Sequence, residues 1–359
     1  MRKHFRIAAL TGGALLALSL PVAAQASTKV VSMGPPPSAS KTFEKLQTEV
    51  NAFFPQSTTI HVGDTVAFQP GFHNVDIPAK GGKPSPFLIP SGQTATGVND
   101  EAGNPFWFNG QPLFGFNPAI LGAPKTATYN GKKSVVGPVP VLGKPFAFKV
   151  TFTKKGTYTY YCDIHTGMKG KVHVVAKTAK APDKKADAKT VNRQVAAAVK
   201  TAQRLQKTIP PSGVVDVGVA GPGGVEYFSI VGPKNPIPVG TTLRFEMTKG
   251  SFEAHTATTG PGDPRNETDT TSYLNKVAST FQGPGPFDGR AIYPSDQPGG
   301  SPASLKPQLH GNGFWSSGAL DLDNRSPLPS NNSVRFDAPG TYEFYCLIHP
   351  VMHTTITVQ

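Results

Sequence analysis

The chain has 359 residues, including 38 Gly and 36 Pro, and only 16% of its residues are charged. This composition favours many short strands and turns over long helices, and it excludes a collagen, a coiled coil and a polytopic membrane protein. With only two Cys, the chain is not a disulfide-stapled miniprotein either. Its length predicts two domains, each large enough to bury its own core.

The formal net charge of +13 is concentrated in two segments. Arg2, Lys3 and Arg6 stand at the N-terminus, and residues 177–207 carry nine Lys or Arg against two Asp, which leaves only +3 for the rest of the chain. No aromatic residues interleave with the basic ones in residues 177–207. We therefore interpret this segment as a solvated linker and expect no nucleic-acid partner.

Residues 1–26 have the pattern of a secretory signal peptide: a basic start, an apolar run and the small-residue site Ala24-Gln25-Ala26. Cleavage at this site would leave Ser27 as the first residue. The apolar run is interrupted by Gly and Pro and is short for a bilayer span of about 20 residues, so we expect no stable membrane insertion after cleavage. The chain is predicted to be exported, periplasmic or extracellular, where free thiols oxidise unless they are bonded or coordinated.

Two segments show the spacing of apolar residues that is typical of an amphipathic helix: Phe43, Leu46, Val50 and Phe53 in the first, and Val195, Ala198, Ala202 and Leu205 in the second. We expect a short helix before each of two runs of strands. The second helix falls in a basic linker, residues 177–212, and the Lys- and Ala-rich start of this linker, residues 177–187, is predicted to be flexible.

Two blocks of sequence are repeated in the same order. The block GTYTYYCDIHTGMKGKVHV, from Gly156, matches GTYEFYCLIHPVMHTTITV, from Gly340, at a separation of 184 residues. The block IHVGDTVAF, from Ile60, matches IPVGTTLRF, from Ile237. The chain is therefore a tandem repeat of one domain, and we place the two copies at residues 27–176 and 213–359.

Alternation of apolar and polar residues dominates both copies and predicts strands. The inward positions of these strands are Phe146, Phe148, Val150, Phe152, Tyr158, Tyr160, Cys162, Val172 and Val174 in the first copy, and Tyr342, Phe344, Cys346, Ile356 and Val358 in the second. The fold class is all-β, with two tandem antiparallel β-sandwiches. Residues 83–145 and 258–333, which are rich in Gly, Pro, Asn and Phe, are predicted to form long loops.

A CxxHxxM motif occurs once in each copy, on the predicted turn between two strands. Its members are Cys162, His165 and Met168 in the first copy, and Cys346, His349 and Met352 in the second. An upstream histidine precedes each Cys, by 89 residues for His73 and by 91 residues for His255. One thiolate and two imidazoles in a plane, with a weak axial thioether, are the ligands of a mononuclear blue-copper electron-transfer site. We predict one such metal site in each copy.

With these motifs the chain resembles the cupredoxins, the group of plastocyanin, amicyanin and pseudoazurin, and its short CxxHxxM loop is most similar to that of amicyanin. The resemblance covers both halves of the chain after the leader and implies Greek-key sandwiches with one type 1 copper each. The segment His73-Asn74-Val75 resembles the family's first-ligand segment, in which the residue after His helps to fix the loop that carries Cys; Thr256 holds that place in the second copy. Both copies have a long insertion between His and Cys that small cupredoxins lack.

A lone Cys or Met is usually a buried apolar residue, and a lone His is usually a satisfied or exposed polar one. These readings would require both Cys, four of the eight His and two of the four Met that follow the leader to match one pattern twice. A disulfide between Cys162 and Cys346 is the other alternative, and it would require two sites in separate sandwiches to face each other closely.

Copper enzymes such as two-domain oxidases and nitrite reductases are the less favoured class. In those families, a histidine stands beside the blue-copper Cys and joins it to further copper ions. Here the flanking residues are Tyr161, Asp163, Tyr345 and Leu347, and no HxH or HCH sequence occurs. The unassigned histidines are too scattered to specify a trinuclear cluster: His61, His173, His310 and His353.

The sequence therefore predicts an exported electron carrier and not an enzyme, with two type 1 copper ions and redox proteins as partners. Its cysteines would provide the electronic path, and His165 and His349, on loops near solvent, would be the edges for electron exchange. Copper storage or delivery outside the cytoplasm is the alternative, and a cell-surface module with vestigial sites is a third class. The oligomeric state cannot be predicted from the sequence.

Overall fold

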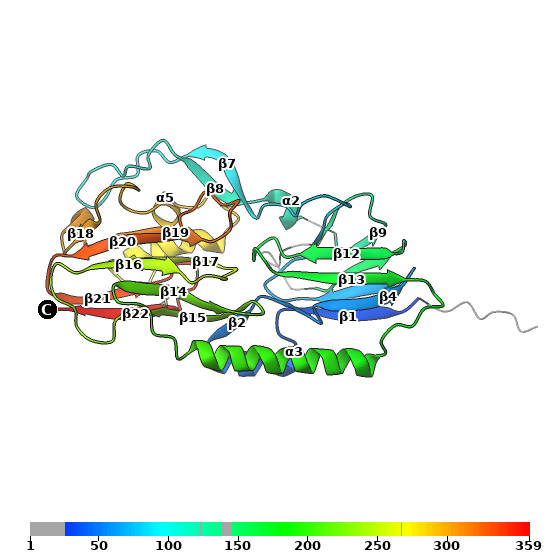
Figure 1. The fold of residues 1–359 in the computed structure, drawn as a ribbon. Helices are drawn as coiled ribbons and strands as arrows, with labels where there is room; N and C mark the ends of the chain where they lie inside the picture. Colours follow the sequence, from blue (N-terminus) through cyan, green and yellow to red (C-terminus); the bar gives the residue numbers. More distant parts are fainter. Residues whose placement is uncertain (1–25, 123, 138, 140–145, 267) are drawn as a thin grey trace, which may run out of the picture.

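A computed structural model describes residues 26–359, with the exception of residues 123, 138, 140–145 and 267. Nearly all of the predicted signal peptide therefore lies outside the described residues. Two β-sandwiches lie side by side, and one long helix runs beneath both of them (Figure 1). Within the described part of the chain, no helix is both long enough and apolar enough to cross a bilayer.

The first sandwich consists of two five-stranded sheets. One sheet contains, in spatial order, β3 (Phe53–Phe54), β1 (Thr28–Met33), β5 (Thr65–Gln69), β11 (Phe148–Phe152) and β9 (Thr126–Tyr129). The other contains β10 (Val135–Val136), β6 (Asp76–Ile77), β12 (Gly156–Tyr161), β13 (Lys169–Val175) and β4 (Ser57–His61). Alternate residues of these strands face inward, so Phe148, Val150, Phe152 and Val172 are buried between the sheets, as the alternation predicts.

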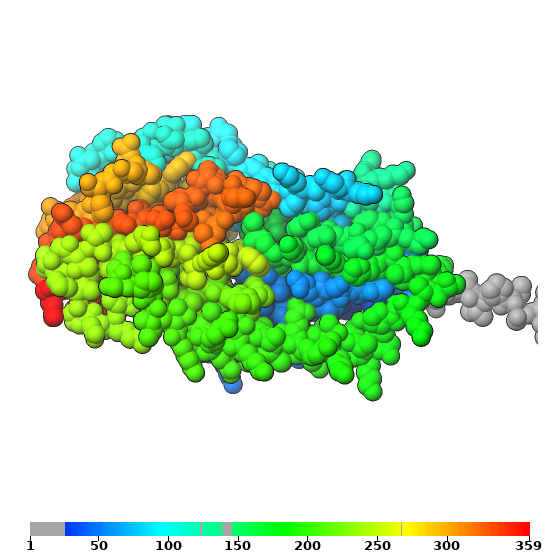
Figure 2. Space-filling view, in the orientation of Figure 1, coloured from blue at the N-terminus to red at the C-terminus, as the bar shows by residue number. Residues whose placement is uncertain are grey.

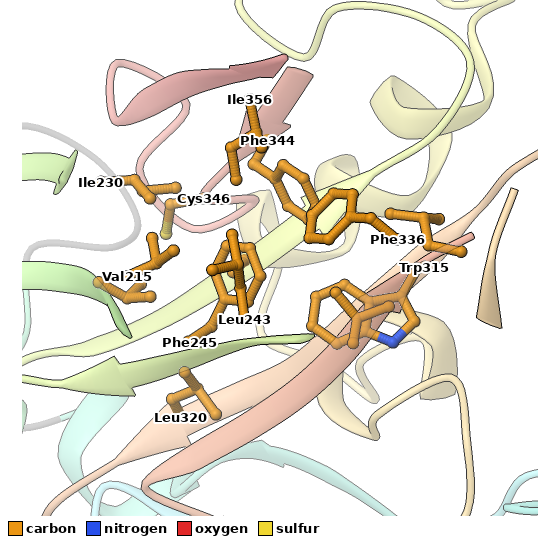
Figure 3. Packing of buried hydrophobic residues seen from close by; sticks show 14 of the residues in the cluster. Val215, Ile230, Leu243, Phe245, Trp315, Leu320, Phe336, Phe344, Cys346 and Ile356 are labelled. Atoms are coloured by element: carbon orange, nitrogen blue, oxygen red, sulfur yellow. The ribbon is translucent and has the colours of Figure 1, made fainter. Parts of the chain in front are cut away.

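The second sandwich has a six-stranded and a four-stranded sheet. The larger contains β18 (Ala303–Leu305), β20 (Asn331–Phe336), β16 (Thr242–Met247), β14 (Val214–Gly221), β15 (Val225–Val231) and β2 (Thr48–Val50). The smaller contains β19 (Trp315–Asp321), β17 (Ala254–Thr259), β21 (Gly340–Tyr345) and β22 (His353–Val358). Figure 3 shows the core between these sheets, where Cys346 lies beside apolar side chains such as Val215 and Ile230.

The repeated sequence is also a repeated topology. In the first sandwich, β5 lies between a parallel partner, β1, and an antiparallel partner, β11. In the second, β16 lies between the parallel β14 and the antiparallel β20. The strands that flank the CxxHxxM segment, β12 with β13 and β21 with β22, pair antiparallel. The two tandem β-sandwiches are thus confirmed, but their sheets are mixed, because crossover connections allow some neighbouring strands to run parallel.

The first predicted helix is wrong over most of its apolar spacing, because Phe43 lies in a helix but Val50 lies in β2 and Phe53 in β3. Helix α1 (Pro37–Lys45) follows β1 and ends before Leu46. The helix cannot continue, because Gln47 has a φ of 48°, in the left-handed region. The chain then extends as β2, which pairs with β15 through Val50 and Val225, so a strand from the N-terminal part completes a sheet of the second sandwich.

Helix α3 (Lys184–Leu205) occupies most of the predicted linker and includes the expected helical spacing from Val195 to Leu205. Its start is capped by the side chain of Asp183, which accepts a hydrogen bond from the backbone N–H of Ala186. Because the helix begins at Lys184, the expectation of a flexible segment through residue 187 is wrong over its last residues. The helix lies along both sandwiches (Figures 1 and 2), and the predicted apolar face is buried through Ala198, Ala202 and Leu205.

The predicted long loops contain short elements of their own. The first insertion holds β7 (Leu88–Thr94), β8 (Pro112–Phe116) and α2 (Pro118–Leu121), as well as β9 and β10. The second holds α4 (Tyr273–Ala278), η1 (Ser279–Gln282), α5 (Gly289–Ile292) and η2 (Leu309–Gly311), as well as β18 and β19. The hairpin of β7 and β8 extends over the second sandwich (Figures 1 and 2), and Phe106 and Phe108 pack with Leu274 and Phe314. Aromatic packing thus ties the first insertion to the second sandwich.

Candidate metal centres

Each CxxHxxM segment forms the connection between two antiparallel strands. Cys162 follows β12 directly, and its backbone N–H donates to the carbonyl of Met168 over 3.0 Å. The N–H of Met168 in turn donates to the carbonyl of His165 over 3.0 Å. In the second sandwich, the equivalent bonds between Cys346, Met352 and His349 measure 3.0 and 2.9 Å. The two loops therefore have the same hydrogen-bonded turn.

The first centre brings three predicted ligands together. The sulfur of Cys162 lies 3.9 Å from Nδ1 of His73 and 3.6 Å from Nδ1 of His165, and the two Nδ1 atoms are 2.8 Å apart. All three side chains are buried. The fourth predicted residue, Met168, is also buried and belongs to the same core cluster as Cys162. Two imidazoles and a thiol that converge within 4 Å fit a soft transition-metal ion.

The second centre repeats this arrangement. The sulfur of Cys346 lies 3.8 Å from Nδ1 of both His255 and His349, whose Nδ1 atoms are 3.1 Å apart. Met352 is buried in the same core cluster as Cys346. The backbone N–H groups of Thr256 and His349 donate to the Cys346 sulfur over 3.3 and 3.4 Å, and such bonds stabilise a thiolate.

The remote nitrogen, Nε2, of each of these histidines faces a glutamate. The distances from Nε2 to the nearest carboxylate oxygen are 3.9 Å for His73 and Glu49, 3.3 Å for His165 and Glu253, 2.9 Å for His255 and Glu226, and 4.0 Å for His349 and Glu253. A carboxylate hydrogen-bonded to Nε2, as Glu226 is to His255, favours the proton on that nitrogen and leaves the Nδ1 lone pair free for a metal. The contacts of His73 and His349 are too long for hydrogen bonds.

Charge in both centres also suits a cation. Burial alone would lower the pKa of His165, but the charges of Glu253 and Cys162 outweigh it and raise that pKa well above its ordinary value. Burial would likewise lower the pKa of His255, but its bonds with Cys346 and Glu226 raise it to about 10. Burial and the neighbouring His165 lower the pKa of His73 well below its ordinary value.

The residue after each upstream histidine is hydrogen-bonded to the residue after Cys. The side-chain oxygen of Asn74 accepts from the backbone N–H of Asp163 over 2.8 Å, and its amide donates to the Asp163 carboxylate over 2.7 Å. In the second sandwich, the hydroxyl of Thr256 accepts from the N–H of Leu347 over 2.7 Å. These bonds join the strand or loop that carries the upstream histidine to the loop that carries Cys.

We expected the loop histidines His165 and His349 to face solvent, but the structure covers them to different degrees. His165 is only 4% exposed, and the side chain of His349 is 21% exposed. Both line a cavity of about 410 Å³ between the sandwiches, together with Phe72, Phe228 and Phe252. The expectation of two solvent-facing exchange edges is therefore wrong for His165, because the second sandwich covers it.

The other histidines lie apart from the two centres, and no bond joins the two cysteines to each other. Within the described ranges, only the two centres above gather three or more residues of metal-binding type. The remaining predicted histidines contact other groups: His61 the carbonyl of Ala179, His173 the hydroxyl of Thr157, His310 the carboxylate of Asp100, and His353 the side chain of Arg265. Cys162 and Cys346 are both free thiols, and no disulfide joins them.

Sequence reasoning did not find the three glutamates. Glu226 lies in β15, and Glu253 precedes β17, so neither belongs to a motif with the Cys loops. The one available signal was an acidic residue in strongly apolar surroundings, since Glu226 follows Val225 at the start of a β-rich run. The closeness of Glu49 to His73 and of Glu253 to His165 depends on the packing of the two sandwiches, whereas Glu226 and His255 both belong to the second sandwich.

Each of the two β-sandwiches thus brings together one thiol and two imidazoles that could hold a metal ion. Residues 44–175 match the family described as copper binding proteins, plastocyanin/azurin family, so this part of the chain is similar to the cupredoxins. No curated protein sequence matches the chain.

Several solved structures are similar to parts of the chain. A mutant of amicyanin in the Cu(I) form has 20% identity, covering 41% of this chain and 82% of its own, with a TM-score of 0.20. A pseudoazurin from Sinorhizobium meliltoi has 19% identity, covering 49% and 98%, with a TM-score of 0.20. A mutant plastocyanin of fern has 19% identity, covering 41% and 100%, with a TM-score of 0.19.

Proposed function

We propose that the protein is an exported electron carrier with one mononuclear type 1 copper site in each sandwich. The observation that carries the proposal is the duplicated cluster in which one Cys sulfur meets two histidine Nδ1 atoms within 4 Å. Bound copper would supply a one-electron couple between Cu(I) and Cu(II). Copper binding by this family supports the choice of metal.

The ligands would have distinct roles. His73, Cys162 and His165 would hold the first ion, and His255, Cys346 and His349 would hold the second. Met168 and Met352 would supply thioether sulfurs that tune the two reduction potentials. Because the ligands are anchored on paired strands and closed turns, the protein would keep them in nearly the same positions in both oxidation states.

Export follows from the leader sequence and agrees with two buried free thiols that metal coordination would protect from oxidation. Redox proteins are the proposed partners. Copper storage or delivery is disfavoured by burial, because seven of the eight proposed ligands are buried and only His349 is partly exposed. A carrier that hands over its metal needs ligands that a partner can reach.

The decisive experiment is metal analysis with a visible spectrum of the purified full chain. The oxidised, copper-loaded protein should bind two copper ions and show an intense visible band. Cys162→Ser should abolish the contribution of the first centre alone, and Cys346→Ser that of the second. Absence of an intense band from the wild type would overturn the assignment, and rapid transfer of copper to an apo acceptor without electron exchange would favour delivery.

A further inference from the structure

One carboxylate stands between the two centres. Oε1 of Glu253 lies 3.3 Å from Nε2 of His165, and its Oε2 lies 4.0 Å from Nε2 of His349. The first histidine belongs to the first sandwich and the second to the other, so Glu253 contacts one proposed ligand of each centre. The only atoms between the two imidazoles along this route are those of a single carboxylate.

Glu253 is held firmly in this position. Its side chain is 5% exposed, and Oε1 also accepts a hydrogen bond of 2.7 Å from the amide of Asn51, which follows β2. Its backbone N–H donates to the hydroxyl of Ser251, which itself donates to Glu226, the carboxylate beside His255. Contacts from both sandwiches thus fix the carboxylate between the two histidines.

The carboxylate uses a different oxygen for each centre. Oε1 faces Nε2 of His165 at 3.3 Å, and Oε2 faces Nε2 of His349 at 4.0 Å, which is the distance of an ion pair and too long for a hydrogen bond. The contact with the first centre is therefore the closer of the two.

The burial of His165 determines how an electron could reach the first centre. A protein partner that docks on the surface cannot reach the imidazole edge of the first centre directly, because the second sandwich and Glu253 cover it. His349 keeps a side-chain exposure of 21%. The accessible edge therefore belongs to the second centre, and the covered edge of the first centre faces it.

We infer that Glu253 couples the two centres, so that electrons pass between them along the chain His165, Glu253 and His349. The inference rests on the proposed function and extends it: the protein would work as a two-electron unit with its entry at the second centre. In each transfer one centre loses an electron and the other gains it. No bond forms or breaks, and no further reactant is needed.

The test uses the full chain with copper in both centres, in a Met352→Gln background. A glutamine in the axial position changes the potential and spectrum of the second centre, so the two centres can be followed separately. A light-driven pulse delivers less than one electron per protein, and absorbance follows its redistribution. We expect a first-order phase whose rate does not depend on protein concentration.

Glu253→Ala should slow this phase at least tenfold, and it should raise the reduction potentials of both centres, because a negative charge beside both histidines favours Cu(II). Glu44→Ala, which removes an exposed carboxylate on α1, is the matched control and should leave rate and potentials unchanged. If Glu253→Ala loses either visible band, Asn51→Ala is measured in its place. This substitution removes the hydrogen bond that holds the Glu253 carboxylate, and it should also slow the phase.

The outcomes separate this inference from the proposed function. Two intact visible bands without a concentration-independent phase in the parent protein would overturn the inference and leave the blue-copper assignment standing. An unchanged rate in Glu253→Ala, or in Asn51→Ala where that variant is read, would overturn it as well. Absence of visible bands from the wild type would instead overturn the proposed function.

Discussion

Gly218 and His255 lie in direct contact at the second centre. A Cβ atom added at Gly218 would stand 2.6 Å from Nε2 of His255 and 2.4 Å from Oε1 of Glu226, the carboxylate that faces the same nitrogen. The residue also has a φ of 77°, a conformation that glycine adopts at little cost. A side chain at this position must displace His255, Glu226 or both.

Gly218→Ala should therefore damage the second centre and spare the first. We expect one copper per chain in place of two, with the visible band of the first centre retained. Gly240→Ala is the matched control, because that glycine has a φ of 89° but no atom within 4 Å of the added Cβ. Equal copper loss in both variants would show that backbone strain, and not the contact with His255, is responsible.

The strands and the ligand loops were predictable because their signals are local. Alternation along residues 148–152 and 156–161 reflects a sheet with one buried face, and the spacing within CxxHxxM fixes a tight turn. Because the sequence is repeated, each of these patterns occurs twice, once in each copy. His73 and His255 were assigned to the Cys loops because the pattern of ligands resembles that of a known family. The separation of about 90 residues does not by itself predict the contact.

The arrangement of the two sandwiches could not be predicted in this way. Nothing in the sequence around Thr48–Val50 indicates that this strand joins a sheet of the other sandwich, because strand pairing over such separations depends on the whole fold. The same holds for Glu253, whose neighbours His165 and His349 come from different sandwiches. The burial of His165 is a consequence of that packing, so it was missed as well.

Asn74 and Thr256 should each support only the centre of their own sandwich. Asn74→Ala leaves the buried N–H of Asp163 without its partner, and Thr256→Val does the same for Leu347. Each loss should lower the free energy of unfolding by about 1–3 kcal/mol. Each should also shift the visible band of its own centre, because the Cys loop is less firmly held.

Chemical denaturation and visible spectra of the two variants provide this measurement, and the centre in the unaltered sandwich serves as the internal control. A shift of both bands by one substitution would contradict independent support of the two loops. Unchanged stability in Asn74→Ala would show that water replaces the amide at Asp163.

Helix α3 should stabilise the molecule through one apolar face. Ala202 is fully buried in a cluster with Phe43 and Val219, whereas Ala197, on the same helix, is exposed. Ala202→Glu places an unpaired charge in this cluster and should lower the free energy of unfolding by about 3 kcal/mol or more. Ala197→Glu should change it by no more than about 0.5 kcal/mol.

Limited proteolysis provides an independent measurement of whether helix α3 is packed against the sandwiches. Residues 184–205 should resist cleavage in the wild type and in Ala197→Glu, and they should be cut readily in Ala202→Glu. Rapid cleavage of the wild type within this range would contradict a docked helix.

Asp64 should make stability depend on pH in the acidic range. Its carboxylate accepts hydrogen bonds from the backbone N–H groups of Ser27 and His61 over 2.8 and 2.9 Å. Burial alone would raise the pKa of Asp64, but these bonds outweigh it and lower that pKa below the ordinary value of 3.8. The folded state therefore binds this proton less readily than the unfolded state, so the stabilisation is present above pH 3.8 and is lost as the pH falls through the lowered pKa.

Asp64→Asn should lower the free energy of unfolding by about 1–3 kcal/mol at pH 7. Urea denaturation of both proteins at pH 7 and at pH 3 measures this difference, which should shrink at the lower pH because the wild-type carboxyl begins to take up its proton. If the export signal is removed after Ala26, the amide of Ser27 becomes an ammonium group and the contact becomes an ion pair. A chain that begins at Ser27 should then lose more stability on Asp64→Asn than a chain that keeps Ala26, and an equal loss in both would argue against this pairing.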